Sequence, residues 1–286
     1  MTTSPQNHHC PICKSSHIDT WGSAADIGNA DIIHKIAKCN ECTHIFVHPL
    51  PSKEFLAEAY KTSSKSVLSG DSFYDFRSKG SFSEGDLWVL KHLKKRVKQG
   101  NLIDIGAANT MLLSMIIESG WKVSIVEPSQ NVERMSSLSN IQICRGLFED
   151  CVFQNNFEMV SAIDVLEHTH SPIDFLKKAK SILSFRGNAL LRFPNSYSLK
   201  CKLEHDKWNM IRPLGHLHFF SPRSFQAACK TCQLKIVELK SHDLNNYLSL
   251  SIAGQNIRGM RFMLPLRWFL NKMLLGDQLL AMVSHE

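Results

Sequence analysis

The chain has 286 residues, a formal net charge of +7 and an apolar fraction of 43%. This length suits one large domain with a small appendage, because domains usually span about 100–200 residues. The sequence holds no apolar run long enough for a transmembrane helix, and its N-terminus lacks the basic and apolar regions of a secretory signal. We therefore expect a soluble, cytoplasmic protein whose positive charge favours an anionic partner.

The N-terminal segment contains two C-x-x-C pairs. Their members are Cys10, Cys13, Cys39 and Cys42. Each pair can present two thiolates to one tetrahedral ion, and four soft sulfur ligands suit a structural Zn²⁺ with no open coordination position. The spacing predicts a zinc-ribbon module over residues 1–55 with a small β-rich insert. His8, His9 and His44 could replace a cysteine ligand, but we interpret them as surface histidines.

Residues 56–99 are predicted to form a linker or lid and a lead-in helix. The stretch 61–86 is rich in Ser, Lys and Gly, which is typical of a linker or a mobile lid. From about Leu87 to Val97, apolar residues recur at helical spacing and lysines occupy the opposite face. We interpret this lysine face as solvated, with nucleic-acid contact as the alternative.

Beyond Gly100, short apolar runs alternate with helical patterns up to residue 286. The predicted strands are Leu102–Ile105, Val123–Glu127, Ile141–Cys144, Met159–Ile163, Ala189–Phe193, Ile236–Leu239 and Leu279–Val283. Helices are predicted after Ser171 and after Ser221, because in both places a capping serine precedes a proline. The alternation predicts an α/β domain over residues 100–286, with helices on both faces of its sheet and ligands at the carboxyl ends of the strands.

The first two predicted strands have the features of a nucleoside-binding site. Asp104 lies near the end of the first strand, and Gly106 lets the backbone approach a ligand closely. Glu127 ends the next strand, where a carboxylate can accept hydrogen bonds from both ribose hydroxyls. Because Ala108 and Thr110 interrupt the G-x-G-x-x-G pattern, a nucleoside without a pyrophosphate fits this turn better.

Several stretches, in this order and spacing, resemble one known family. They are CPIC…CNECTHIFVHPLPSKEFLAEAY, LIDIGAANTMLL, VSIVEPS, GLFED, IDVLEHTHSPIDFL, LLRFPN and GHLHFFSPRSF. The chain resembles the class I S-adenosylmethionine-dependent methyltransferases over residues 10–225. In particular it resembles the zinc-ribbon-bearing group of polysaccharide and secondary-metabolite clusters, and more loosely the ubiquinone-biosynthesis O-methyltransferases. The resemblance implies a Rossmann-like seven-stranded sheet whose last strand, in GDQLLAMVSHE, is antiparallel.

The same resemblance implies a set of residues around S-adenosyl-L-methionine. They are Asp104, Gly106, Ala108, Glu127, Phe148, Glu149 and Asp164. Asp104 would orient the methionine amino group and Glu127 would bind the ribose. Phe148 and Glu149 would flank the adenine, and Asp164 or the backbone near it would lie beside the transferred methyl group.

The turn after the first strand departs from the family pattern. The family usually has D-x-G-x-G-x-G there, whereas this chain has Ala108 and Thr110 in place of two glycines. Threonine is the larger change, because glycine gives a backbone freedom that other residues lack. A catalytically degenerate binding protein with the methyltransferase fold is therefore an alternative.

Histidines near two predicted strand ends are candidates for proton removal from an oxygen acceptor. Histidine is the natural base near neutral pH, and His168 in VLEHTH and His216 in GHLHFF are both expected on the carboxyl side of the sheet. His218 is a weaker candidate. Glu167 either orients His168 or caps the loop, and each histidine could instead only hydrogen-bond a neighbouring loop.

The C-terminal residues 243–276 mix arginines with Leu, Met, Phe and Trp. We expect a helical insertion that packs on the domain and shapes the substrate pocket. An interfacial helix over residues 256–275, in contact with a membrane or a lipid-linked substrate, is the alternative, although Pro265 interrupts it.

The sequence thus predicts a methyltransferase that uses S-adenosyl-L-methionine and a structural Zn²⁺. Its expected acceptor is an oxygen of a saccharide or related small molecule, and the positive net charge favours an acceptor that is anionic or nucleotide-linked. An RNA methyltransferase that docks through the ribbon is a second interpretation, but an aromatic and basic RNA-binding stripe is missing beyond the short face of residues 87–97. A non-enzymatic binding module is the third.

Overall fold

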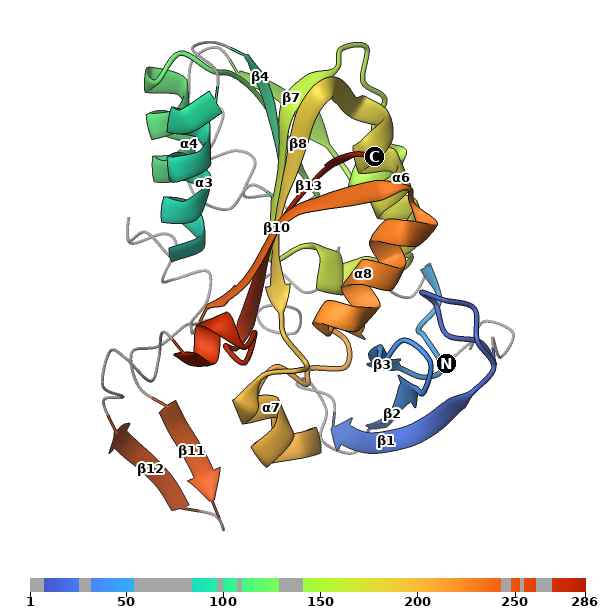
Figure 1. The fold of residues 1–286 in the computed structure, drawn as a ribbon. Coiled ribbons are helices and arrows are strands. Elements are labelled where there is room, and N and C mark those ends of the chain that lie inside the picture. The colour runs from blue at the N-terminus through green and yellow to red at the C-terminus, as the bar shows by residue number, and fades with distance from the viewer. Residues whose placement is uncertain are drawn as a thin grey trace.

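The structure is a computed structural model that describes residues 8–25, 32–53, 84–96, 100–106, 110–128, 141–242, 248–252, 255–260 and 269–286. A central sheet is covered by α3 and α4 on one face and by α6 and α8 on the other (Figure 1). The N-terminal strands lie beside one end of this layered unit.

The central sheet has seven strands. In sheet order they are β10 (Leu234–His242), β13 (Gln278–His285), β8 (Leu183–Pro194), β7 (Phe157–Ile163), β4 (Asn101–Ile105), β5 (Lys122–Glu127) and β6 (Ile141–Arg145). Strands β4 to β8 are parallel where they pair, and β13 is antiparallel to both β8 and β10. The seven predicted strands and the antiparallel last strand are confirmed.

Four helices bury both faces of this sheet. They are α3 (Glu84–Arg96), α4 (Thr110–Glu118), α6 (Pro172–Ile182) and α8 (Pro222–Thr231). Side chains of a strand alternate between the faces. In β4, Leu102 belongs to the hydrophobic cluster of α3 and α4, whereas Ile103 belongs to the cluster of α6 and α8. Ser171 and Ser221 cap α6 and α8 through backbone hydrogen bonds to their side chains, as their sequence pattern predicts.

A second sheet joins the N-terminal residues to a distant part of the chain. Its strands are β1 (Ile18–Ala25), β2 (Ile33–Cys39), β3 (Ile45–Val47) and β9 (His218–Phe219). Phe46 pairs with His218 in this sheet. The Leu217 carbonyl accepts a hydrogen bond from the Val47 amide, and the Leu217 amide donates to the Glu167 carbonyl. The N-terminal strands therefore hold the segment that carries the histidines of GHLHFF.

The C-terminal insertion corrects one expectation. Instead of a helix, residues 248–260 contain an antiparallel pair of strands, β11 (Leu248–Ile252) and β12 (Gln255–Met260). The sequence LSLSI alternates apolar and polar residues with a period of two, which suits a strand. A helical turn follows at residues 269–272, and residues 261–268 lie outside the described chain. The alternative of an interfacial helix over residues 256–275 is thus wrong for its first part.

Shorter elements complete the described fold. They are α7 (Leu199–Glu204) and the 3-10 turns η1 (Phe148–Asp150), η2 (Leu166–His168) and η3 (His205–Lys207). Within the described ranges, no helix is both long and apolar enough to span a bilayer. The predicted linker or lid at 61–86 lies outside those ranges for all but its last three residues, and the boundaries at 55 and 99 stay predictions.

Candidate functional site

The four cysteines of the two C-x-x-C pairs come together. The Sγ atoms of Cys10 and Cys42 lie 3.5 Å apart, as do those of Cys13 and Cys39. All four sulfur atoms lie within 4.8 Å of one another. A tetrahedral Zn²⁺ with Zn–S bonds of about 2.3 Å separates its sulfurs by about 3.8 Å. The cluster therefore fits an N-terminal zinc ribbon.

The two cysteine pairs share one backbone conformation. Lys14 and Thr43, each directly after the second cysteine of a pair, have φ values of 62° and 64°. In both turns the amide of this residue donates to the carbonyl of the first cysteine, over 3.0 Å to Cys10 and 2.9 Å to Cys39. This repeated turn directs both thiols of each pair to the same side. Two distant segments are thus folded alike around one centre.

His44 is not the surface histidine expected from the sequence. Its side chain is completely buried, and its Nε2 lies 3.1 Å from Nδ1 of His218. Burial lowers the pKa of His44 well below its ordinary value, so the ring is neutral. The turn after Cys42 directs the ring toward β9, where His218 supplies a partner. His8 and His9 are exposed, as expected.

The predicted cofactor residues Asp104 and Gly106 lie at the carboxyl end of β4, in the central sheet. Asp104 is buried in β4, and the Ser161 hydroxyl of the adjacent β7 donates a hydrogen bond to its carboxylate. Gly106 follows with a φ of +70°, and a Cβ built there would lie 2.7 Å from Cγ2 of Val165. This position therefore requires glycine for both its backbone conformation and its close contact. Ala108 lies outside the described residues.

The next strands along this edge carry the other predicted cofactor residues. Glu127 is the last residue of β5 and is 5% exposed. After β6, the ring of Phe148 packs against Phe175 of α6, with 5.0 Å between ring centroids, while Glu149 is exposed. Of the predicted adenine neighbours, Phe148 therefore anchors the turn η1 in the core and Glu149 faces solvent.

Asp164 directly follows β7 and forms an ion pair with the buried Arg192 of β8. Both carboxylate oxygens accept hydrogen bonds from the guanidinium, and the Asp164 amide donates to the Arg192 carbonyl over 2.9 Å. Burial opposes the charge of Arg192, but the Asp164 carboxylate raises the pKa of this arginine above its ordinary value. With φ at 57°, Asp164 turns the chain directly into η2. The ion pair thus fixes the start of the segment that carries His168.

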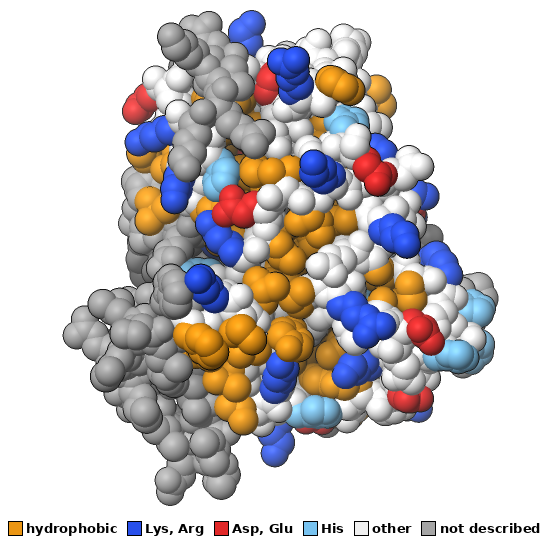
Figure 2. Space-filling model, viewed as in Figure 1, with side chains coloured by type: hydrophobic (Ala, Val, Ile, Leu, Met, Phe, Trp, Pro, Cys, Tyr) orange, Lys and Arg blue, Asp and Glu red, His pale blue; other side chains and the backbone are white. Residues whose placement is uncertain are grey.

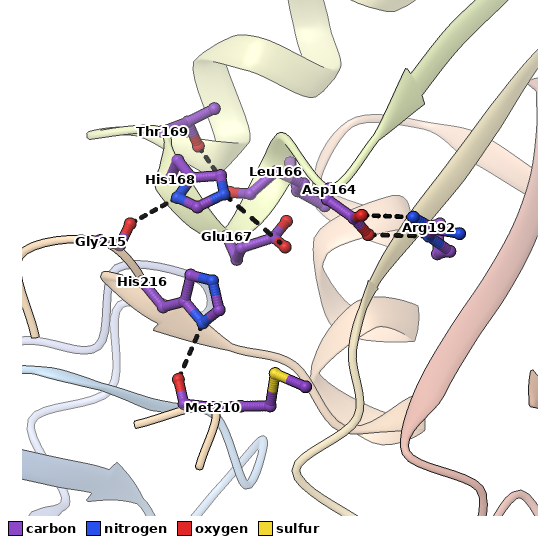
Figure 3. A network of polar contacts seen from close by, with 9 residues as sticks. All are labelled: Asp164, Leu166, Glu167, His168, Thr169, Arg192, Met210, Gly215 and His216. Carbon is purple, nitrogen blue, oxygen red and sulfur yellow. Dashed lines mark hydrogen bonds and ion pairs between the residues drawn. The ribbon is translucent and has the colours of Figure 1, made fainter. Parts of the chain in front are cut away.

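Glu167, His168 and His216 form a second cluster next to this turn (Figure 3). The Nε2 atom of His168 lies 3.9 Å from a carboxylate oxygen of Glu167, and the rings of His168 and His216 meet edge to face at 4.9 Å between centroids. One ligand atom from each residue lies within 4.8 Å of the others. The structure thus brings together the two histidines that the sequence singles out separately.

Burial keeps both imidazoles of this cluster neutral. Desolvation lowers the pKa of His216 to about 3, and it also lowers the pKa of His168, although the Gly215 carbonyl opposes this shift. His218, the weaker candidate, lies outside the cluster because the strand alternation turns it toward His44. Desolvation lowers its pKa to about 3 as well.

The structure shows two features near the site that the sequence analysis does not predict. One is Arg192, and its signal is a charge inside the apolar run LLRFP, because a buried charge requires a partner. The other is a disulfide between Cys144 of β6 and Cys151, which encloses η1. The sequence gives no distinct signal for this bond, since its cysteines form no C-x-x-C pair.

The seven-stranded sheet with one antiparallel strand, and the acidic residues at its strand ends, define a class I S-adenosylmethionine-dependent methyltransferase fold. A family model described as "Methyltransferase domain" matches residues 84–239, more than half of the chain. The chain therefore belongs to this methyltransferase family. Among curated proteins, none matches the chain.

Solved structures show the same fold at low sequence identity. A Burkholderia thailandensis 1,6-didemethyltoxoflavin-N1-methyltransferase, with bound 1,6-didemethyltoxoflavin and S-adenosylhomocysteine, is 11% identical with a TM-score of 0.54, covering 88% of this chain and 96% of that chain. A chain from a complex between a Haloferax volcanii methyltransferase activator and a methyltransferase is 16% identical with a TM-score of 0.52, covering 76% and 96%. An S-adenosylmethionine-dependent methyltransferase from Listeria monocytogenes is 12% identical with a TM-score of 0.50, covering 71% and 97%.

Proposed function

We propose that this protein transfers a methyl group from S-adenosyl-L-methionine to an oxygen of a small-molecule acceptor, such as a saccharide. The observation that carries the proposal is the juxtaposition of His168, His216 and Glu167 beside the strand ends of a methyltransferase sheet. An oxygen acceptor must lose a proton during methylation, and two neutral imidazoles beside a carboxylate suit that task. A cytoplasmic location is part of the proposal: four reduced cysteines placed to bind a metal suit that compartment, whereas the Cys144–Cys151 disulfide is unusual for it.

The described residues fit the cofactor at three points. Gly106 leaves room where a side chain would collide with Val165. Glu127, at the end of β5, suits the ribose hydroxyls as a hydrogen-bond acceptor. Asp104, held by Ser161, suits the methionine ammonium group. S-adenosyl-L-methionine would supply an activated methyl group on a sulfonium.

The protein's part in this chemistry is orientation and proton removal. Methyl transfer is an in-line displacement, so holding the acceptor in line with the methyl group supplies most of the rate. The Asp164–Arg192 ion pair fixes η2, and the Leu217 amide binds the Glu167 carbonyl, so the two histidine-bearing segments keep their relative position. Burial of Glu167 and His216 limits access of water to the reacting groups.

The cysteine cluster would hold Zn²⁺ in a structural role. Four sulfur ligands saturate a tetrahedral ion, which leaves no position for an acceptor. The module would instead support the active site structurally, because β3 pairs with β9 and thereby holds the GHLHFF segment in place.

The face shown in Figure 2 gives the RNA alternative little support. Lys and Arg side chains are scattered over the face shown in Figure 2, between hydrophobic and acidic side chains, and form no continuous basic stripe among the residues drawn there in colour. An anionic or nucleotide-linked small molecule needs only a few such charges.

Calorimetry with S-adenosyl-L-methionine tests the proposal. We expect saturable binding, followed by transfer of a labelled methyl group to members of a panel of saccharides and nucleotide-linked sugars. Absence of binding at millimolar cofactor would overturn the enzymatic function and leave the degenerate binding module. Methylation of RNA alone, with steep salt dependence, would establish the RNA alternative instead.

A further inference from the structure

The hydrogen bonds of the two clustered histidines define where their lone pairs lie. Nδ1 of His216 contacts the Met210 carbonyl at 2.8 Å, and Nδ1 of His168 contacts the Gly215 carbonyl. A carbonyl oxygen only accepts, so Nδ1 is the protonated nitrogen of both rings. In a neutral imidazole, Nε2 then carries a lone pair.

Both Nε2 atoms lie on the same side of the loops as the Glu167 carboxylate (Figure 3). The three groups each offer one ligand atom, and these atoms lie within 4.8 Å of one another. Ligand atoms on a first-row metal ion lie about 3–3.5 Å apart when each bond is about 2.1 Å. Small side-chain rotations therefore suffice to bring all three to one ion.

We propose that Glu167, His168 and His216 bind a divalent transition-metal ion, such as Zn²⁺, which is separate from the ion of the four cysteines. Two histidines and one glutamate are a ligand set used by catalytic zinc, with a position left open for water or substrate. The Nδ1–H to carbonyl bonds are the outer contacts that fix the tautomer and ring orientation of metal-bound histidines.

The surroundings favour a cation at this place. Glu167 is 1% exposed, and a buried carboxylate needs compensation by positive charge. Arg192, the nearby buried cation, donates hydrogen bonds to Asp164 and also attracts the Glu167 carboxylate electrostatically, so Glu167 lies in a region that already stabilises opposite charges. The His168 side chain is 25% exposed, so the cluster has one side open to a ligand.

Such an ion would determine which acceptors react. This role rests on the proposed function, with the ion in place of the free imidazoles as the group that promotes loss of the acceptor's proton. A hydroxyl bound at the open position loses its proton to water more easily, since a metal ion lowers its pKa. The oxygen then attacks the methyl carbon, a C–O bond forms, and the electrons of the broken C–S bond stay on the sulfur. Acceptors with a second oxygen beside the hydroxyl can chelate the ion and are therefore the expected class.

Metal analysis of the full-length protein tests this site without a catalytic assay. After depletion with a chelator and reloading with Zn²⁺, we expect two equivalents per chain in the wild type. One equivalent should remain in His168→Asn and in His216→Asn, whose amide nitrogen takes the position of Nδ1 and can still donate to the carbonyl that each ring contacts. His205→Asn, at an exposed histidine away from the cluster, should retain two.

Cobalt distinguishes the two sites in the wild type, so the test survives a variant that fails to fold. Co²⁺ on four thiolates gives intense charge-transfer absorption, whereas Co²⁺ on nitrogen and oxygen gives weaker visible bands. We expect both, with the second set lost in His168→Asn and in His216→Asn. A wild type with only the thiolate signal and one equivalent of metal overturns the proposal, as does a second equivalent that survives both substitutions.

Failure of the metal site and failure of the proposed function are distinguishable. If the second ion is absent but the wild type binds S-adenosyl-L-methionine and methylates an acceptor, the histidines act without a metal and this inference is overturned. If the second ion binds but the cofactor does not, the site is supported and the proposed function falls.

Discussion

The hydroxyl oxygens of Thr43 and Ser221 lie 2.6 Å apart, although 178 positions separate these residues in the chain. Thr43 completes the second cysteine turn, and Ser221 caps α8. A hydrogen bond therefore runs directly from the cysteine cluster to a helix of the central sheet. The cluster and the catalytic fold should for this reason lose stability together.

Replacement of one cluster cysteine should reveal the structural metal. In Cys10→Ser we expect less than about half an equivalent of Zn²⁺ at the cluster and a melting temperature lowered by at least about 5 °C, because metal binding is coupled to folding. Metal analysis and thermal unfolding provide the measurements. Cys201→Ser makes the same chemical change at a buried cysteine away from the cluster and should leave the metal bound. Unchanged stability and metal content in Cys10→Ser would refute the ribbon.

Substitution of Gly106 should impair both stability and cofactor binding. An alanine at a φ of +70° costs about 1–2 kcal/mol in backbone strain, and its Cβ would collide with Val165. We expect Gly106→Ala to lower the free energy of unfolding by about 1–3 kcal/mol and to weaken S-adenosyl-L-methionine binding. Addition of Val165→Ala should recover only the part due to the collision. Wild-type stability in urea together with wild-type affinity in calorimetry would contradict this account.

Loss of the Glu127 charge should weaken cofactor binding specifically. A hydrogen bond to a charged group contributes about 1.5–3 kcal/mol, so Glu127→Gln should raise the Kd for S-adenosyl-L-methionine by about 10- to 100-fold. Glu118→Gln removes an exposed carboxylate at the end of α4 and should leave the Kd unchanged. Calorimetry measures the Kd of each variant. Equal affinity of both variants for S-adenosyl-L-methionine would show that Glu127 does not bind the cofactor.

Removal of Arg192 should destabilise the fold strongly. Arg192→Met leaves the Asp164 carboxylate without its partner, and breaking a buried pair on one side costs about 3–5 kcal/mol. Arg186→Met changes an exposed residue of the same strand and should cost less than about 0.5 kcal/mol. Urea unfolding measures both. The double variant Arg192→Met with Asp164→Asn should lose less than Arg192→Met alone, and a larger loss would argue against an unpaired charge as the cause.

Alkylation should distinguish three classes of cysteine: the four of the cluster, the three other free thiols, and the two in the disulfide. Burial raises the pKa of Cys201 and of Cys229 to about 12, and it also raises that of Cys232, so these thiols should resist alkylation in the native protein. Denaturation with a chelator should expose seven free thiols, because Cys144 and Cys151 are disulfide-bonded. Mass spectrometry after alkylation gives the count. Nine modified cysteines without a reductant would show that the disulfide does not form.

Periodicity predicts the elements correctly where each strand and helix buries a regular face. The seven strands and the caps at Ser171 and Ser221 follow from patterns only a few residues long. The helix predicted for the C-terminal insertion is wrong at β11 and β12, where the basic and apolar composition of the insertion outweighs the period-two pattern of LSLSI in a reading of the sequence. The burial of His44 cannot be predicted from its neighbours in sequence, because it depends on a strand more than 170 residues away.

What the sequence by itself determined is therefore local or contiguous: the two cysteine pairs, the alternation of strands and helices, and the acidic residues at strand ends. These follow from spacing along the chain, since ligand number and side-chain direction are set by neighbouring residues. Only the tertiary structure decided that Glu167, His168 and His216 meet, that Arg192 neutralises Asp164, and that His218 turns to His44 instead. Such contacts join elements that are distant in sequence, so they form only once the order of the strands in the two sheets is established.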